Sequence, residues 1–396
     1  MTPDEIPIAA TAVGDLHRQA DAHQAAGRHA EALEAFQAAA ALAPGDPVLA
    51  YNVASTLRLL GRPAEALAAY DRAVALNPRF AMAQHNRAAL LLQLGDYRAG
   101  FQAFEWRKSS PGFDDPRYAL PRQWAGQSLR GRRLFIYPEF FQGDLLQFGR
   151  YAALAIVAGA EVTLAAPRAM HAILRTMDPR LQLADEDAVP GDGGYDFVSA
   201  LLSLPGGFGT TVATVPRGRY LQAEPERVAR WRSRVGEGGF KVGVVWQGSA
   251  ASSAPPVPRA FPLAAAAPLA GLAGVRLISL QKGPGLAQLS GLPAGMTVET
   301  LGEDFDPGSD LYLDTAAAVL ACDLVVAMDG AIVHLAGALG AKTWLAVPQV
   351  PDWRWMDGRA DTPWYPTVRL YRQTAFNDWG GVFAAMARDL RERPDA

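Results

Sequence analysis

The sequence has almost no cysteine and no long hydrophobic run. Its one cysteine is Cys322 among 396 residues. A lone thiol excludes an internal disulfide framework and a site built from several cysteines, so we interpret Cys322 as a small buried hydrophobe. No stretch approaches the roughly 20 uninterrupted apolar residues that a membrane-spanning helix needs. The first residues, Met1-Thr-Pro-Asp-Glu5, show no signal-peptide pattern. We therefore expect a soluble, cytoplasmic protein.

An excess of charge and several well-known motifs are also missing. The formal net charge is −3, which gives no general attraction to nucleic acid or anionic membranes. The chain contains neither a Gly-x-x-x-x-Gly-Lys-Ser/Thr loop nor a Gly-x-Ser-x-Gly elbow, which argues against a P-loop NTPase and a serine hydrolase. Asp304 and Asp306 lie in an acidic loop without a clear third ligand, so we predict a solvated loop and no metal site.

Half of the residues are hydrophobic, and the first part of the chain repeats itself. The period is 34 residues, with a glycine, a small residue, an aromatic residue and a proline at fixed offsets. The matching positions are Gly27, Gly61 and Gly95; Ala32, Ala66 and Gly100; Phe36, Tyr70 and Phe104; and Pro44 and Pro78. This pattern predicts about three tetratricopeptide (TPR) helix pairs over residues 1–110. Such a stack either binds a protein or peptide partner in its groove or packs on the next domain, and the sequence leaves both open.

A turn-rich linker is expected over residues 111–129, and the texture of the chain then changes. Short apolar strands alternate with helices, which predicts Rossmann-like parallel sheets. We expect one such domain over residues 130–236 and a second over residues 237–376, followed by a C-terminal helix and tail over residues 377–396. The fold class is therefore α/β with an all-α N-terminal part.

The stretch from Asp323 to Gly340 is the most informative one in the second domain. It reads as a buried strand, a turn of small residues and a helix. The turn Asp329-Gly330-Ala331 would direct the N–H groups and the positive dipole end of the helix at one spot, which suits a pyrophosphate. His334, one turn further on, could face the same spot. The alternative is an ordinary strand–helix unit in which Asp329 caps the helix and His334 is a packed side chain.

Further candidates follow other strands. Asp144 begins a helix predicted over residues 144–157, where it could act as a general base or as a helix N-cap. Arg259 and Lys282 follow a Pro-rich loop and a strand end. Each could neutralise phosphate or remain a solvated surface charge.

Six stretches occur together in the order known from one family. They are Tyr137-Pro-Glu with Gln142-Gly-Asp-Leu-Leu-Gln-Phe-Gly-Arg-Tyr151, Gly243-Val-Val-Trp-Gln-Gly248, Ser279-Leu-Gln-Lys-Gly-Pro284, Asp314-Thr-Ala-Ala317, Asp329 with His334-Leu-Ala-Gly-Ala-Leu-Gly340, and Pro351-Asp-Trp-Arg-Trp355 with Trp364-Tyr-Pro366. On these residues the chain resembles bacterial TPR proteins whose C-terminal part is similar to family 9, heptosyltransferase-like glycosyltransferases.

The resemblance implies a GT-B architecture, in which the active site lies between two Rossmann-like domains. It implies an inverting, metal-independent transfer from a nucleotide-diphosphate sugar, with no cofactor beyond this co-substrate. Asp144 would be the catalytic base. The donor-binding residues would be Gly143, Gln247, Gly248, Arg259, Gln281, Lys282, Asp329, Gly330, Ala331 and His334. The acceptor would be a protein, a peptide or a glycan, presented through the TPR groove as in the similar protein O-GlcNAc transferases.

Three departures from the family pattern support a different reading. The loop before the base is Phe140-Phe-Gln-Gly-Asp144 in place of Gln-Gly-Leu-Gly-Asp. Asp329-Gly-Ala-Ile-Val-His334 lacks the usual threonine, and the second-domain loop Ala251–Pro258 is not basic. The alternative function is a TPR scaffold that carries a degenerate, inactive GT-B domain.

Overall fold

The computed structural model describes residues 5–191, 194–248 and 259–392. By its internal contacts the chain separates into two compact units. One consists of Met1–Asp114 with Val350–Asp357, and the other of Asp115–Gln349 with Gly358–Ala396. The predicted Pro-rich loop Ala251–Pro258 and the last residues of the predicted tail lie outside the described residues. In the described part, no helix combines the length and the apolar character that a bilayer crossing requires.

The first unit is built from antiparallel helix pairs. Its helices are α1 (Glu5–Ala25), α2 (His29–Leu42), α3 (Pro47–Leu59), α4 (Pro63–Leu76), α5 (Ala81–Gln93) and α6 (Tyr97–Phe104). Gly27, Gly61 and Gly95 end the first helix of each pair with φ angles of 74°, 68° and 95°. Glycine adopts this left-handed conformation without the penalty that a Cβ atom brings. The predicted helical repeat is confirmed.

The other repeated positions form the core of the helical unit. Ala32, Ala66 and Tyr70 are completely buried. At the third equivalent position, a Cβ atom on Gly100 would come within 2.7 Å of the Leu92 side chain, so α6 approaches α5 more closely than alanine would permit. The aromatic residues of the repeats, Phe36, Tyr70 and Phe104, are buried as well.

A segment from the far end of the chain belongs to this helical unit. The short 3₁₀ helix Trp353–Trp355 packs on α5, and the Trp353 ring lies 5.8 Å from the ring centroids of both Phe101 and Phe104. The Asp357 N–H donates to the Gln93 carbonyl at 3.1 Å. The sequence predicts these residues within the domain at 237–376, whereas their contacts group them with the repeats. The other predicted domain boundaries stay predictions.

The second unit contains two sheets whose strands are all parallel. The first has the order β3-β2-β1-β4, with β1 Arg133–Tyr137, β2 Glu161–Ala166, β3 Gln182–Asp185 and β4 Phe197–Ala200. The second has the order β10-β9-β8-β5-β6-β7, with β5 Phe240–Val245, β6 Val275–Ser279, β7 Glu299–Thr300, β8 Leu324–Ala327, β9 Thr343–Val347 and β10 Val368–Arg372. The α/β prediction is therefore confirmed, and both sheets have crossover connections.

Helices connect these strands. They are α7 (Gln142–Phe148), α8 (Arg150–Val157), α9 (His171–Leu174), α10 (Leu204–Gly207), α11 (Pro225–Val235), α12 (Ala267–Ala270), α13 (Leu313–Ala321), α14 (Ala331–Leu339) and α15 (Trp379–Arg391). The single helix predicted over residues 144–157 is wrong, because the chain forms α7 and α8 there. At the junction the Ala152 N–H donates to the Gly149 carbonyl at 2.8 Å, an i to i+3 bond that tightens the turn.

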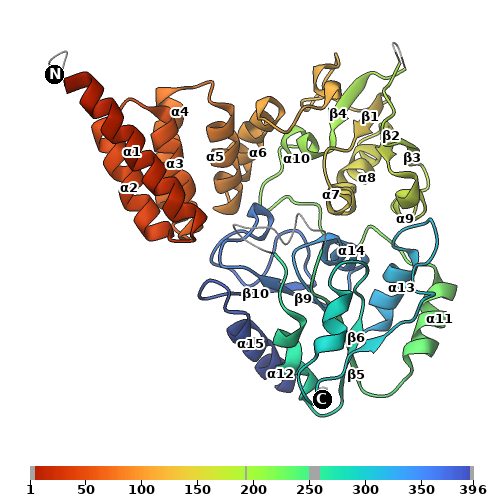
Figure 1. Ribbon diagram of the computed structural model, residues 1–396. Helices are drawn as coiled ribbons and strands as arrows, with labels where there is room; N and C mark the ends of the chain where they lie inside the picture. Colours follow the sequence, from red (N-terminus) through yellow and green to blue (C-terminus); the bar gives the residue numbers. More distant parts are fainter. Residues whose placement is uncertain (1–4, 192–193, 249–258, 393–396) are drawn as a thin grey trace. The chain divides into compact units, whose positions relative to one another are not determined.

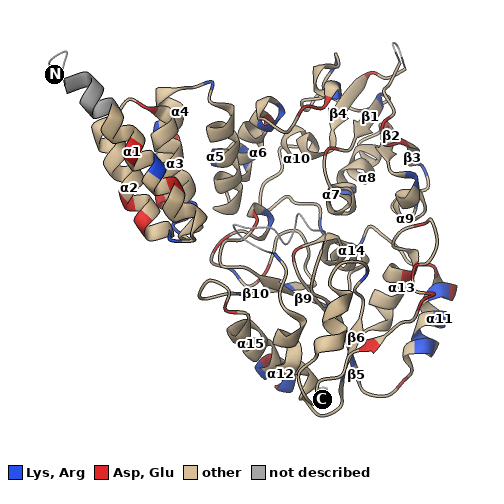
Figure 2. Ribbon diagram, viewed as in Figure 1, with Lys and Arg blue, Asp and Glu red and all other residues tan. Residues whose placement is uncertain are grey.

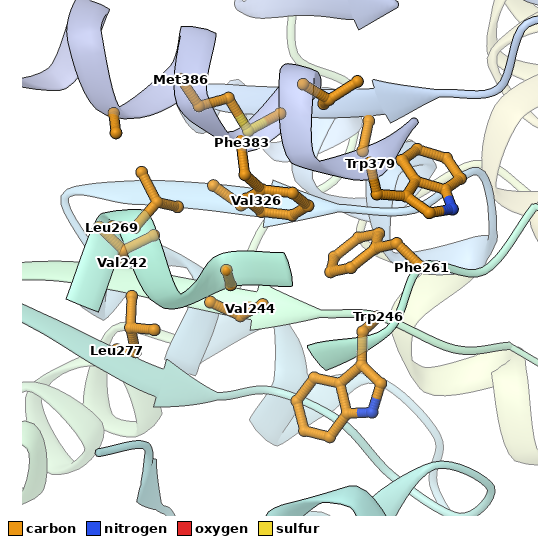
Figure 3. Close-up of a cluster of buried hydrophobic side chains, with 14 of the residues drawn as sticks. Val242, Val244, Trp246, Phe261, Leu269, Leu277, Val326, Trp379, Phe383 and Met386 are labelled. Atoms are coloured by element: carbon orange, nitrogen blue, oxygen red, sulfur yellow. The ribbon is translucent and has the colours of Figure 1, made fainter. Parts of the chain in front are cut away.

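A large hydrophobic cluster anchors the second sheet (Figure 3). Val242 and Val244 alternate along β5 and point into it, and the Phe261 and Phe383 rings lie 4.8 Å apart between β5 and α15. Cys322 lies outside this cluster. Its sulfur packs against Gly243, where an added Cβ atom would come within 3.0 Å of it. Burial raises the pKa of the Cys322 thiol to about 12, so it stays protonated.

Candidate functional site

The N-terminal turns of α7 and α14 lie against each other in the second unit (Figure 1). Helix α7 follows β1 and α14 follows β8, so both turns lie at carboxyl ends of strands. A Cβ atom on Gly143 would lie 3.3 Å from His334 Cδ2 and 3.5 Å from the Ala331 Cα. The Tyr312 hydroxyl donates to Gln142 Oε1 at 2.5 Å and adds a polar contact between the two halves. The structure thus brings the proposed base and the proposed phosphate turn into one neighbourhood.

Asp144 lies in the first turn of α7 with 6% of its surface exposed. Its Oδ2 accepts the Phe141 N–H at 3.4 Å, which is a long capping bond. The interpretation of Asp144 as the helix N-cap is wrong, because Phe141 holds that position and Asp144 is the third residue of α7, from which its carboxylate reaches back to the N-cap N–H. Helix α7, which carries Asp144, contacts α14, and the interpretation of Asp144 as a general base stays a prediction.

Asp329 does not cap α14. Gly330 is the N-cap residue and contributes no side chain to the first-turn N–H groups. Asp329 is 2% exposed, and its Oδ2 lies 3.4 Å from Nη1 of Arg259. The interpretation of Asp329 as a cap is wrong, because the glycine takes that position and the carboxylate turns toward an arginine. The same pair means that Arg259 lies beside a negative charge of this chain.

His334 is buried, with 4% of its surface exposed. Its Nδ1 lies 3.0 Å from the Tyr365 hydroxyl, and the two rings are 5.9 Å apart at 46°. The side chain is therefore packed, as the plainer interpretation expected, and it also borders the N-terminal turn of α7. Tyr365 was not singled out from the sequence as a site residue.

Gln281 organises the loops that follow β5 and β6. Its Oε1 accepts the N–H groups of Trp246 and Gln247 at 3.1 and 3.0 Å. Its Nε2 donates to the carbonyls of Gln247 and Pro284, each at 2.7 Å. Gln281 is 5% exposed, so its amide is committed to shaping the loop that carries Gln247 and Gly248.

Lys282 is held by a neighbouring loop. Its Nζ donates to the carbonyl of Phe305 at 3.0 Å and to that of Asp306. To reach a phosphate, the ammonium group would have to leave these two carbonyls. The structure therefore gives Lys282 a structural role in this conformation.

The acidic loop around Asp306 also has structural bonds. Asp306 accepts hydrogen bonds from the Asp314 N–H at 2.9 Å and from the hydroxyl of Thr315. Both donors lie in the first turn of α13. Asp304 pairs with Arg234 on α11. Among the described residues no group of three or more His, Cys, Asp or Glu side chains is arranged to hold a metal.

Asp314 ties α13 to the arginine-rich helix α11 (Figure 2). Its Oδ1 accepts from Trp231 Nε1 at 2.9 Å and from Arg227 at 3.0 Å, and it also pairs with Arg230. Burial works to raise the pKa of the Asp314 carboxyl, but these hydrogen bonds and guanidinium charges bring it below its usual range. This member of the family-like stretches is a structural residue.

The tetratricopeptide repeat model matches residues 49–80, which confirms the predicted repeat there. Protein FlbA of Caulobacter vibrioides is 28% identical over 322 residues, which cover 76% of this chain and 53% of FlbA. The chain therefore spans about half the length of this curated relative.

The solved structures that are similar to parts of the chain include a glycosyltransferase and a TPR domain. The iron-containing dodecameric glycosyltransferase TibC of enterotoxigenic E. coli is 13% identical and covers 66% of this chain and 67% of its own, with a TM-score of 0.41. The first TPR of Spaghetti (RPAP3) bound to an HSP90 peptide is 24% identical and covers 25% of this chain and 79% of its own, with a TM-score of 0.24.

Proposed function

We propose that the second unit is an inverting, metal-independent glycosyltransferase of the GT-B type, which uses a nucleotide-diphosphate sugar as donor. The observation that carries the proposal is the contact between the first turns of α7 and α14 at carboxyl ends of strands from two parallel sheets. This arrangement supports a reaction in which an acid from one half and an anion-binding turn from the other act on one substrate pair.

The proposed reaction has one chemical step. An acceptor hydroxyl oxygen attacks the anomeric carbon of the donor, its proton passes to Asp144, and the bond from that carbon to the diphosphate breaks. The departing diphosphate gains negative charge, which the N–H groups at Gly330 and Ala331 and the imidazole of His334 stabilise. Arg259 would contribute once the diphosphate competes with Asp329 for its guanidinium.

The acceptor is proposed to be a protein, a peptide or a glycan. The tetratricopeptide match over residues 49–80 supports a protein or peptide, because such repeats present a groove to extended partners. In this proposal the repeats recruit the acceptor and the α/β unit modifies it.

The alternative is a scaffold with an inactive transferase domain, and two contacts favour it. Arg259 faces the Asp329 carboxylate at 3.4 Å, and Lys282 is bound to backbone carbonyls. Both cations that would meet a diphosphate are therefore engaged within the chain. In a working donor site at least one of them must change partner.

The test is consumption of a panel of UDP-, GDP- and ADP-sugars by the full chain, compared with Asp144→Ala. The proposal predicts that one donor is consumed by the wild type, and that the variant loses most of this turnover. Equal turnover in both proteins would remove Asp144 from the mechanism. Failure of the wild type to consume any donor would favour the scaffold.

A further inference from the structure

A buried arginine and two tyrosines connect three separate segments of the second unit to His334. Arg150 begins α8, Tyr220 lies in the segment before α11, Tyr365 precedes β10, and His334 is in α14. Three of these residues fall within the family-like stretches, yet the proposed reaction assigns a role only to His334. We call this group the Arg150–Tyr220–Tyr365 cluster.

Arg150 is 3% exposed, and no carboxylate among the described residues bonds to it. Its Nε donates to the Gln147 carbonyl at 2.8 Å, and Nη1 donates to the carbonyls of Pro216 and Trp364 at 2.9 and 2.7 Å. Its guanidinium carbon also lies 4.6 Å from the Tyr220 ring centroid and 4.5 Å from that of Tyr365. Burial of a charge is costly, and these carbonyls and ring faces offset that cost while fixing both tyrosines.

The hydrogen bonds within the cluster determine where each proton lies. The Tyr220 hydroxyl donates to the Leu146 carbonyl at 2.6 Å and accepts from Arg150 Nη2 at 2.9 Å. The Tyr365 hydroxyl lies 3.0 Å from His334 Nδ1 and 3.4 Å from the Tyr220 oxygen. Because the first distance is normal and the second is long, the Tyr365 proton belongs on the bond to His334. Burial also raises the pKa of Tyr365 well above its usual value, so this proton is retained.

A hydroxyl that donates to Nδ1 requires a lone pair there. In a neutral imidazole the ring proton is then on Nε2. The position of Tyr365 is itself fixed by α14, since a Cβ atom on Gly337 would come within 2.4 Å of the Tyr365 ring. Tyr220 is fixed to the end of the same helix, where its N–H donates to the Ala338 carbonyl at 3.0 Å.

We propose that Tyr365, held by Arg150 and Tyr220, is a positioning residue that fixes His334 in the tautomer with its proton on Nε2. In this tautomer the imidazole offers an N–H donor, which is the form that an anionic diphosphate recognises. This role rests on the proposed function, but the tautomer itself can be measured without any nucleotide.

The experiment is long-range ¹H–¹⁵N correlation NMR on the full chain with labelled histidine, with the His334 signals identified from a His334→Asn variant. The wild type is expected to show the Nε2–H pattern for His334. In Tyr365→Phe the donor to Nδ1 is lost, so the pattern should change to a mixture or to Nδ1–H. Tyr220→Phe should keep the Nε2–H pattern, because the Tyr365 proton then has no competing tyrosine oxygen.

The matched control is Tyr151→Phe, which removes a different buried hydroxyl, bonded to Thr210 at 3.0 Å. This variant should leave the His334 signals unchanged, and near-UV circular dichroism should verify that every variant is folded. A wild-type Nδ1–H pattern, or a Tyr365→Phe pattern equal to that of the wild type, would overturn the inference.

A second readout connects the tautomer to the site. If UDP, GDP or ADP binds the wild type, Tyr365→Phe should weaken that binding by about tenfold, the equivalent of one charge-assisted hydrogen bond. Unchanged binding in that case would remove the positioning role. If none of the three binds while the wild type has the Nε2–H pattern, the proposed function fails and the tautomer assignment stands.

Discussion

At the scale of single residues, Asp144 combines two roles that a substitution can separate. Asparagine keeps a side-chain oxygen that can cap a helix, but it cannot take up a proton. We expect Asp144→Asn to unfold near the wild-type temperature and to lose at least about 100-fold in transfer rate. The measurements are donor consumption and a thermal melt.

The control for this substitution is Asp378→Asn. Asp378 caps α15 in the same unit, where it accepts the Gly381 N–H at 2.8 Å. The Asp378→Asn variant should show a change in melting temperature as small as that of Asp144→Asn, but it should keep full transfer activity. If Asp144→Asn retains full activity, the Asp144 carboxylate serves only to accept the N-cap N–H.

Asp314 gives a prediction about pH and stability. Its pKa is below the ordinary value of 3.8, so its contribution to stability is present above that value and is lost as the pH falls through the lower, folded-state pKa. We expect Asp314→Asn to lower the free energy of unfolding at pH 7 by about 2 kcal/mol, because buried donors lose a charged acceptor. Urea unfolding should show this difference shrinking below about pH 4.

Asp361→Asn provides the comparison, because Asp361 makes a salt bridge to Arg359 with 73% of its side chain exposed. Its effect on the unfolding free energy should be near zero. A difference for Asp314→Asn that stays constant down to pH 2 would contradict the assigned cause.

Residue-level prediction from sequence succeeded where a backbone conformation imposes the residue. The glycines at 27, 61 and 95 are such a case, since their φ angles are positive. The donor list could not be resolved in the same way, because Gln281 bonds to Gln247 and Lys282 bonds to Phe305, and both partners are distant along the chain. A polar residue at the end of a strand has the same sequence pattern whether its side chain bonds to another loop or to a ligand.

At the scale of elements, α14 depends on a close approach by Tyr365. A methyl group on Gly337 would lie 2.4 Å from Cδ1 of that ring, so Gly337→Ala should destabilise the protein by about 1–3 kcal/mol. Helix propensity alone predicts the opposite sign, because alanine is favoured over glycine by about 1 kcal/mol. The free energy of unfolding from urea titration decides between them.

Gly291→Ala is the matched substitution, since a Cβ atom there meets nothing within 4 Å. It should be close to neutral. A stabilised Gly337→Ala protein would show that the Tyr365 ring is not held against α14.

Most elements of the α/β unit could be predicted from their apolar pattern. The strand over Arg133–Tyr137 and the helix beginning at Trp379 are examples. The break between α7 and α8 was missed because no proline marks it in the sequence. At this break the backbone changes locally from i to i+4 hydrogen bonds to an i to i+3 bond. The short strand Glu299–Thr300 was missed because two residues are too few to show an alternation of apolar and polar side chains.

At the scale of the whole molecule, the third helix pair includes a segment from the far end of the chain. Trp353 contacts Phe101 and Phe104, which both belong to α6. Helix α6 has only eight residues. Because each repeat contacts only its neighbours, we expect Trp353→Ala to increase amide hydrogen exchange in α5 and α6 and to leave α2 unchanged. Mass-spectrometric exchange on the full chain measures both regions.

Trp344→Ala serves as the control, because Trp344 packs on Tyr371 in the second unit, with ring centroids 4.9 Å apart. It should leave exchange in α5 and α6 at the wild-type level. Unchanged exchange in Trp353→Ala would mean that the repeats do not depend on residues 350–357. This contact could not be predicted from the sequence, because the residues Pro351-Asp-Trp-Arg-Trp355 do not indicate which distant segment they pack against.

The central claim is that the turn before α14 binds a nucleoside diphosphate beside Asp144. The most direct measurement is calorimetric titration of the full chain with UDP, GDP and ADP. We predict that one of them binds with a dissociation constant of about 1 mM or below, and that His334→Ala weakens this binding. Absence of binding by all three would contradict the account and leave a scaffold with a transferase-like fold.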